Sequence, residues 1–143
     1  MDYATVPAPA FGRAMRGMGL NLLVLDVRRS AAFLTDVFGM AAHRASVDFA
    51  IMGYGGQLFQ LHADATFAGH PLAGLLPEAG PRGAGAEFRL YDTDPDAAWA
   101  RARVRNDALP LREPQDRPHG LREAVILCPD GYAWVPSRPL AGT

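Results

Sequence analysis

The chain has few of the residues that mark several common classes of protein. It has one cysteine, Cys128, in 143 residues, which excludes an internal disulfide and a cluster of thiolate metal ligands. We expect this cysteine to be a small buried apolar residue. Basic residues form no tract, and 14 Lys+Arg balance 15 Asp+Glu. Neither nucleic acid nor an anionic membrane surface is therefore an expected partner.

Long apolar runs and catalytic signatures are also missing. No uninterrupted apolar stretch reaches the roughly 20 residues of a membrane-spanning helix. The N-terminus has neither the basic start nor the apolar core of a signal peptide, so we expect a cytoplasmic protein. The sequence has no Gly-x-Ser-x-Gly, His-Glu-x-x-His or phosphate-cradling glycine motif, and so predicts no nucleophilic hydrolase, zinc protease or nucleotide site.

What the sequence does contain is an internal repeat. Residues 19–26 (GLNLLVLD) are matched by residues 85–92 (GAEFRLYD), at an offset of 66. Each copy begins with Gly, ends with Asp and has apolar residues at its even positions. Each is followed, after three residues, by a small polar residue and an Ala-Ala-aromatic triplet. We interpret each copy as a strand, a tight connection and a helix.

A second correspondence completes each half. Residues 56–60 match residues 131–135 at an offset of 75, so both halves are predicted to be β-α-β-β-β. In the first half, strands are expected at 19–27, 41–44, 48–52 and 57–62, with a helix from Ser30 as N-cap to about Phe38, closed by Gly39. In the second half, strands are expected at 87–92, 109–112, 121–127 and 132–136, with Pro95 as first helical residue and a helix to about Asn106. Pro110 restricts the strand at 109–112 to a sheet edge.

The expected organisation is a single domain, 1–143. Residues 1–17 hold closely spaced prolines and are interpreted as a frayed tail or a loosely docked arm, with an arm laid over a neighbour as the alternative. Module one covers 18–65 and module two covers 84–138. Between them, residues 66–83 are rich in Gly and Pro, which predicts a linker.

These residues resemble the vicinal oxygen chelate superfamily, which includes glyoxalase, bleomycin-resistance and extradiol-dioxygenase relatives. The resemblance covers roughly residues 18–138 and implies an α+β fold. In that fold, two β-α-β-β-β modules in one chain form half-barrel sheets around a cavity, often completed in a homodimer. The residues that carry it are 26–33 with 38–40, 87–92 with 94–98, and 119–123 with 129–132.

Metal enzymes of this superfamily place ligands, commonly His and Glu and sometimes Gln, on the first and last strands of each module. Carried over, these positions fall at Gly19 or Asn21, and at Gln60, Glu87 and Val135. Only Gln60 and Glu87 are credible ligands, whereas a catalytic metal generally takes about three from the protein. We therefore expect no cofactor, with a divalent metal as the alternative.

Strand alternation supplies candidate site residues without the resemblance. The even positions of the first strand are apolar and are predicted to face the helix, so the odd positions face the other way. The equivalent positions on the other strands complete an apolar surface with a few polar groups, as in small-molecule sites. His119, in a loop, is added as a residue that could gate the pocket. The ligand-binding candidates are Asn21, Leu23, Leu58, Gln60, His62, Glu87, Arg89, Tyr91 and His119.

Ordinary structural roles are the alternative for each candidate: solvated residues at a sheet rim, hydrogen-bonded core amides, or a surface or turn histidine. Glu87 and Glu123 are the candidate catalytic groups, because a buried carboxylate without a partner has a raised pKa and can act as a base. Arg89 would instead keep Glu87 ionised. His43 and the turn at residues 53–56 are assigned no part in a site.

Two functions remain. The first is a metal-independent protein that sequesters a small aromatic or amphipathic compound in an apolar cavity, as the bleomycin-resistance branch does. The second is an enzyme, namely a lyase, isomerase or dioxygenase. It would use a weak metal site at Glu87 and Gln60, or Glu87 or Glu123 as a metal-free general base.

Overall fold

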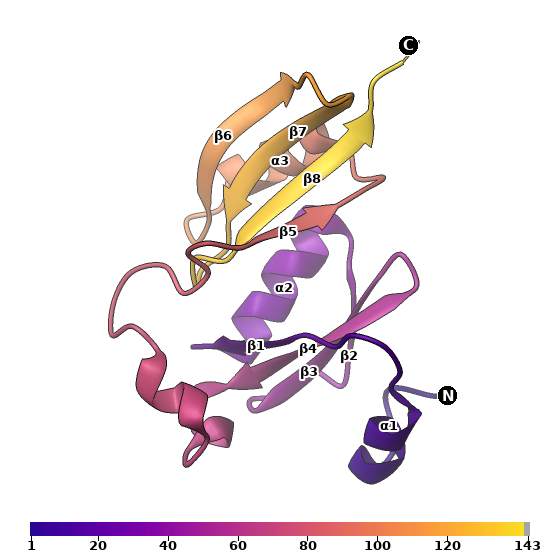
Figure 1. Cartoon of the computed structure of the whole chain (residues 1–143), viewed down its shortest axis with the longest axis vertical. Coiled ribbons are helices and arrows are strands. Elements are labelled where there is room, and N and C mark those ends of the chain that lie inside the picture. The colour runs from indigo at the N-terminus through magenta and orange to yellow at the C-terminus, as the bar shows by residue number, and fades with distance from the viewer. Residues whose placement is uncertain (142–143) are drawn as a thin grey trace. The chain divides into compact units, whose positions relative to one another are not determined.

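The computed structural model describes residues 1–141, which form two compact units (Figure 1). Unit 1 comprises Met1–Thr35 and Gly39–Leu75, and unit 2 comprises Asp36–Phe38 and the chain from Leu76 onward. Each unit contains one four-stranded mixed sheet. Among residues 1–141, no helix combines the length and the apolar content that crossing a membrane requires.

The sheet of unit 1 has the strand order β1-β4-β3-β2. β1 runs parallel to β4, and the other neighbours are antiparallel. Two short 3-10 helices follow β4, in the region predicted to be a linker. The elements are α1 (Ala8–Ala14), β1 (Asn21–Val24), α2 (Val27–Phe38), β2 (Ala41–His43), β3 (Phe49–Tyr54), β4 (Gln57–Ala63), η1 (Asp64–Phe67) and η2 (Pro71–Leu75).

The sheet of unit 2 repeats this topology, with the order β5-β8-β7-β6 and a parallel pair between β5 and β8. The predicted α+β class and the duplicated β-α-β-β-β module are therefore confirmed. The elements are β5 (Glu87–Leu90), α3 (Pro95–Arg103), β6 (Leu109–Asp116), β7 (Leu121–Leu127) and β8 (Ala133–Pro139).

Aspartates begin the two module helices. The Asp26 carboxylate accepts a hydrogen bond from the Arg29 N–H at 3.0 Å, and Asp94 caps α3 in the same way. The prediction of Ser30 as N-cap is wrong, because α2 starts one turn earlier and Ser30 lies buried within it. The predicted helix end at Gly39 is confirmed, since this residue has the left-handed φ of 72°.

The strand predicted at 109–112 is longer in the structure, where β6 runs to Asp116. Its register against β7 shifts between Pro110 and Arg112 and again between Arg112 and Gln115. Such irregularities let a proline-containing strand continue without losing its partner. β6 is an edge strand, as Pro110 predicted.

Apolar side chains fill the space between each sheet and its helix. Leu22 and Val24 are 4% and 1% exposed, and Leu23 between them is 4% exposed as well, so both faces of β1 are covered and burial alone does not separate its even from its odd positions. In unit 2, Ala98 and Ala102 of α3 are fully buried, as is Ile126 of β7. Cys128 is also buried, as expected.

Candidate functional site

The face of the first sheet opposite α2 gathers the five ligand candidates of unit 1. Strand pairing sets Asn21 beside Gln60 and Leu23 beside His62. It also sets Leu58 beside Gly53. Paired residues project to the same face of a sheet. The predicted juxtaposition in this unit is therefore present in the structure.

The N-terminal segment, residues 1–17, covers part of that face. Val6 and Phe11 are 8% and 6% exposed and form an apolar cluster with Ile51, and Phe49 and Leu58 pack against it. The Arg44 guanidinium also donates a hydrogen bond to the carbonyl of Val6. The segment thus lies against the sheet of its own unit and contains a short helix, α1, which its prolines did not predict.

Gln60 and His62 contact each other on this face. The Gln60 Oε1 lies 3.2 Å from the His62 Nε2. The His62 ring packs at 5.1 Å from the Phe49 ring and at 5.2 Å from the Phe67 ring, between centroids. Burial lowers the pKa of His62, so this histidine is a neutral member of an aromatic cluster at neutral pH. The amide of Gln60 is accordingly engaged with a side chain of its own strand.

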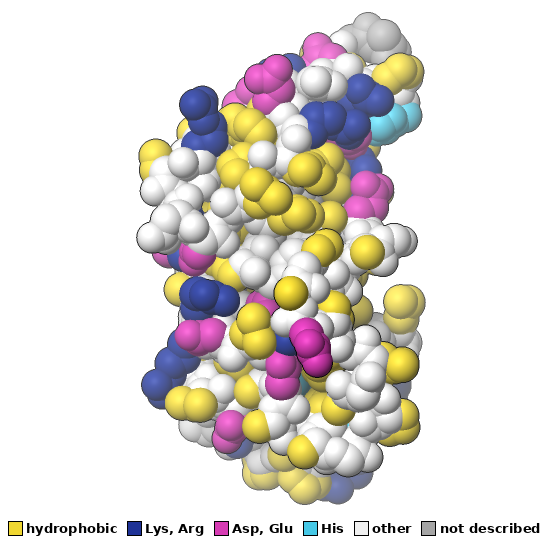
Figure 2. All heavy atoms as spheres, turned by 90° about the vertical axis from the view of Figure 1, so that its left-hand side faces the viewer, with side chains coloured by type: hydrophobic (Ala, Val, Ile, Leu, Met, Phe, Trp, Pro, Cys, Tyr) yellow, Lys and Arg dark blue, Asp and Glu magenta, His cyan; other side chains and the backbone are white. Residues whose placement is uncertain are grey.

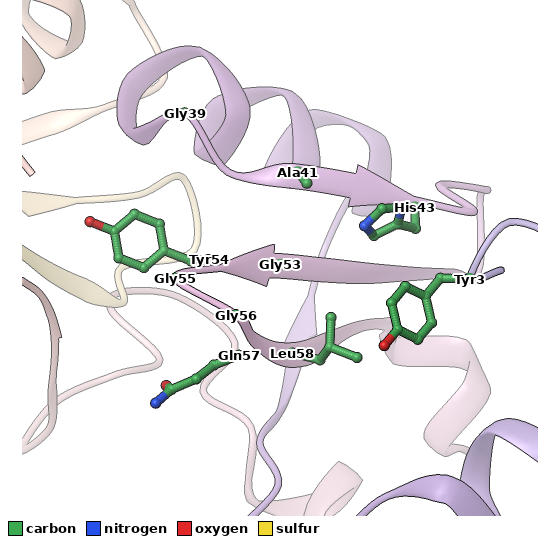
Figure 3. A pocket seen from close by; sticks show the side chains of 10 residues that line it. All are labelled: Tyr3, Gly39, Ala41, His43, Gly53, Tyr54, Gly55, Gly56, Gln57 and Leu58. Carbon is green, nitrogen blue, oxygen red and sulfur yellow. The ribbon is translucent and has the colours of Figure 1, made fainter. Parts of the chain in front are cut away.

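A groove of about 540 Å³ opens on the same face, toward the β2 edge. Figure 3 shows Gly53 at its centre, Tyr54 at one end, and Tyr3 and His43 at the other. The remaining lining comes from Gly39, Ala41, the turn glycines and the start of β4. Sequence reasoning missed this groove, because it assigned His43 and the turn at 53–56 no role. Gly53, the one glycine beyond the two-residue turn Gly55-Gly56, was the available signal.

The face of the second sheet opposite α3 carries the other candidates. Arg89 donates from Nη1 to the Glu87 carboxylate at 2.9 Å and from Nη2 to the Glu123 carboxylate. Arg112 Nη2 lies 3.3 Å and His119 Nε2 lies 3.2 Å from Glu123 oxygens. We call these five residues the Glu123 cluster. Its central carboxylate is 4% exposed, whereas that of Glu87 is 53% exposed.

Tyr91 lies at the border of the Glu123 cluster. The Arg89 guanidinium carbon is 5.7 Å from the centre of the Tyr91 ring, a cation–π distance. The Tyr91 side chain is itself exposed. Three predicted residues of unit 2, namely Arg89, Tyr91 and Glu87, are therefore neighbours, and His119 reaches the same cluster through Glu123.

The electrostatics of the cluster keep Glu123 ionised. Burial raises the pKa of this carboxyl, but hydrogen bonds and charges from Arg89 and His119 outweigh it and hold the pKa below its ordinary value of 4.5. For Arg89, burial lowers the pKa, and the two carboxylates outweigh that effect and raise it. A carboxylate with a depressed pKa is a weak general base.

The donors at the superfamily's ligand positions do not fit a metal ion. On β8, the residue beside Glu87 is Ala133, and neither this alanine nor Val135, two residues further along, can coordinate. Glu87 itself is bonded to a guanidinium. Within residues 1–141, no three His, Cys, Asp or Glu side chains are grouped in a way that could hold a metal ion.

Comparison with known proteins agrees with this architecture. The family model described as "Glyoxalase/Bleomycin resistance protein/Dioxygenase superfamily" matches residues 18–135. No curated protein matches the chain.

Solved structures share the fold at low sequence identity. A glyoxalase/bleomycin resistance protein/dioxygenase family enzyme from Burkholderia phytofirmans PsJN has a TM-score of 0.67 and 18% identity, covering 85% of this chain and 97% of its own. TioX from Micromonospora sp. ML1 has a TM-score of 0.62 and 22% identity, covering 88% and 100%. A lactoylglutathione lyase from Agrobacterium tumefaciens has a TM-score of 0.60 and 22% identity, covering 86% and 92%. These likenesses concern the fold and not the activity.

Proposed function

Because this chain belongs to the Glyoxalase/Bleomycin resistance protein/Dioxygenase superfamily, we propose that it binds a small aromatic or amphipathic compound without a metal held by its own residues. The observation that carries the proposal is the position of Arg89. Its guanidinium bridges Glu87 and Glu123 on the face where metal enzymes of the superfamily hold their ion. A permanent cation of the protein thus neutralises the carboxylates that a metal would need.

The surroundings of the bridge favour binding over catalysis. Val135 is buried beside Arg89 on the paired strand, and Val125 and Leu127 lie on the same face. An apolar surface with a few fixed polar groups is typical of small-molecule sites. The depressed pKa of Glu123 argues against a general base at this position. If the chain were an enzyme, its general base would therefore be Glu87, or it would use a weakly held metal.

The test is metal analysis of protein purified without chelator. We expect Fe, Mn, Ni and Zn all well below one equivalent per chain, and we expect no change in a Glu87→Ala variant. A stoichiometric metal that is lost in Glu87→Ala would overturn the proposal. Glu87→Gln serves as the matched control, because it keeps the shape of the side chain and removes its charge.

A homodimer is also proposed, by analogy with the superfamily and from the surface of unit 2. Figure 2 shows hydrophobic side chains gathered on one face over that unit. Leu109 and Leu111 of the edge strand β6 are 56% and 58% exposed. Contiguous exposed apolar surface often marks an interaction site. We expect a second copy of the chain to cover it.

A further inference from the structure

The groove of unit 1 has a composition that selects its occupant. We propose that it binds an uncharged, planar aromatic compound, with the N-terminal segment as one of its walls. The inference rests on the proposed function in taking the ligand to be a small organic molecule. It adds a binding position in unit 1, besides the apolar surface around Arg89 in unit 2, and the chemical class of the occupant.

The first argument is charge. The groove is lined by ten residues, and none is Asp, Glu, Lys or Arg, although charged residues make up 20% of the chain. A charged ligand would lose hydration there without gaining a side-chain counter-ion, which is costly. An uncharged ligand has no such cost, and Gln57 and His43 can hydrogen-bond to its polar atoms.

The second argument is shape. Gly53 lies within β3, where a side chain would be expected, and leaves the floor of the groove open. A Cβ atom at this position would lie 3.6 Å from Leu58 Cδ2, 3.8 Å from Ala41 Cβ and 3.8 Å from His43 Nε2. The space between these three residues is thus the space that the missing side chain leaves. A glycine backbone, which has no side chain, permits the close approach of a flat ring.

The third argument is the position of the aromatic rings. Tyr3 is held between Phe11, at 6.1 Å and 82° between ring planes, and His43, at 5.4 Å and 58°. Tyr54 stands at the opposite end of the groove (Figure 3). The rings of Tyr3 and Tyr54 thus offer edge-to-face and offset contacts to the ring of a bound aromatic compound. Tyr3 lies outside the residues that match the superfamily, 18–135, so this wall belongs to the part of the chain beyond the family match.

The experiment uses the uncharged fluorescent probe N-phenyl-1-naphthylamine with the full chain and a Gly53→Val variant. Valine suits a strand, Gly53 does not have a left-handed φ, and a Cβ atom at this position lies at ordinary contact distances from its three nearest neighbours. We expect the variant to fold like the wild type and to bind the probe about tenfold more weakly or worse, a loss of about 1.4 kcal/mol. Gly19→Val is the matched control, because nothing lies within 4 Å of a Cβ atom at that exposed position.

A second variant and a second probe keep the result decisive. Tyr3→Ala removes a wall of the groove, together with its ring contacts to Phe11 and His43, and should also weaken binding of the uncharged probe. The sulfonated analogue, 8-anilinonaphthalene-1-sulfonate, should show no dependence on Gly53. Failure of the wild type to bind the uncharged probe would overturn the proposal, as would wild-type affinity in both variants. An equal effect of Gly53→Val on the two probes would show that the groove does not select uncharged ligands. A stoichiometric metal in the purified protein would overturn only the proposed function.

Discussion

At the scale of single residues, Arg89 and Glu123 define the chemistry of the second sheet. Glu123 is nearly fully buried and accepts hydrogen bonds from two arginines and a histidine. Removing one partner of a buried ion pair lowers the free energy of unfolding far more than replacing the whole pair by apolar residues, because the remaining charge stays desolvated. The loss of a single partner of Glu123 is therefore expected to destabilise the folded chain.

Replacing Arg89 by Met should destabilise the protein. We expect the free energy of unfolding at neutral pH to fall by about 3 kcal/mol, because Arg112 and His119 compensate Glu123 only in part. Urea denaturation followed by circular dichroism measures the change. Arg138 lies on the other face of the same sheet, 47% exposed and 3.9 Å from Asp96. Arg138→Met should therefore cost less than about 1 kcal/mol, and equal losses in the two variants would contradict the assignment.

Glu123 should also make stability depend on pH in the acidic range. Its pKa in the folded chain lies below the ordinary value of 4.5, so the unfolded chain takes up a proton first as the pH falls. The stabilisation is complete above pH 4.5 and is lost as the pH drops through the folded pKa. In Glu123→Gln, the free energy of unfolding should fall less steeply below pH 4.5. Glu113→Gln, at an exposed position, should retain the wild-type slope.

At the scale of elements, the N-terminal segment is the part whose structure differs most from what its sequence predicts. α1 has seven residues, too few to be a stable helix on its own in water. It persists because Phe11 and Val6 bury their side chains against β3 and β4. Docking, and not helix propensity, therefore holds this segment in place.

A Phe11→Ala variant should release α1 from the sheet. Truncating a buried Phe costs about 3 kcal/mol, and here the loss falls on local opening of residues 1–17, with less effect on global unfolding. We expect cleavage by trypsin after Arg13 and Arg16 to be roughly 100-fold faster than in the wild type, as followed by mass spectrometry. Met18→Ala, at a side chain that is 95% exposed, should be cleaved at the wild-type rate. Equal rates in all three proteins would show that α1 is not held by Phe11.

At the scale of the whole molecule, two copies of one topology carry different chemistry. The paired positions Asn21 and Gln60 of unit 1 correspond to Glu87 and Ala133 in the pairing of unit 2. One sheet face is partly covered by the chain's own N-terminus, and the other has an ion-paired cluster. Duplication thus conserved the backbone hydrogen bonding while the side chains on these faces diverged.

The proposed homodimer is tested on the intact protein. Light scattering coupled to gel filtration should give about twice the chain mass of 15.4 kDa. A Leu111→Asp variant should shift the mass toward that of the monomer, because a charge within an apolar contact is costly. Val47→Asp, at a side chain that is 65% exposed in unit 1, is the control. A monomeric mass for the wild type would contradict the proposal.

Sequence patterns by themselves determined the helices and strands of the duplicated module, though not α1. These signals act between neighbours in the chain, so they can be recognised from the sequence alone. They include the alternation of apolar residues in β1, Pro95 at the start of α3 and Gly39 at the end of α2. The pairing of Asn21 with Gln60 was not predicted, since the partner of a strand lies far away in the sequence.

Tertiary structure alone decided which side chains engage one another. The bridge from Arg89 to Glu123 joins residues 34 apart, and the contact of Arg44 with Val6 joins residues 38 apart. No local pattern encodes such pairs. The groove around Gly53 is likewise formed by β2, β4 and the N-terminal segment together. Its space exists only where these segments meet, because a missing side chain makes a cavity only when its neighbours do not fill the gap.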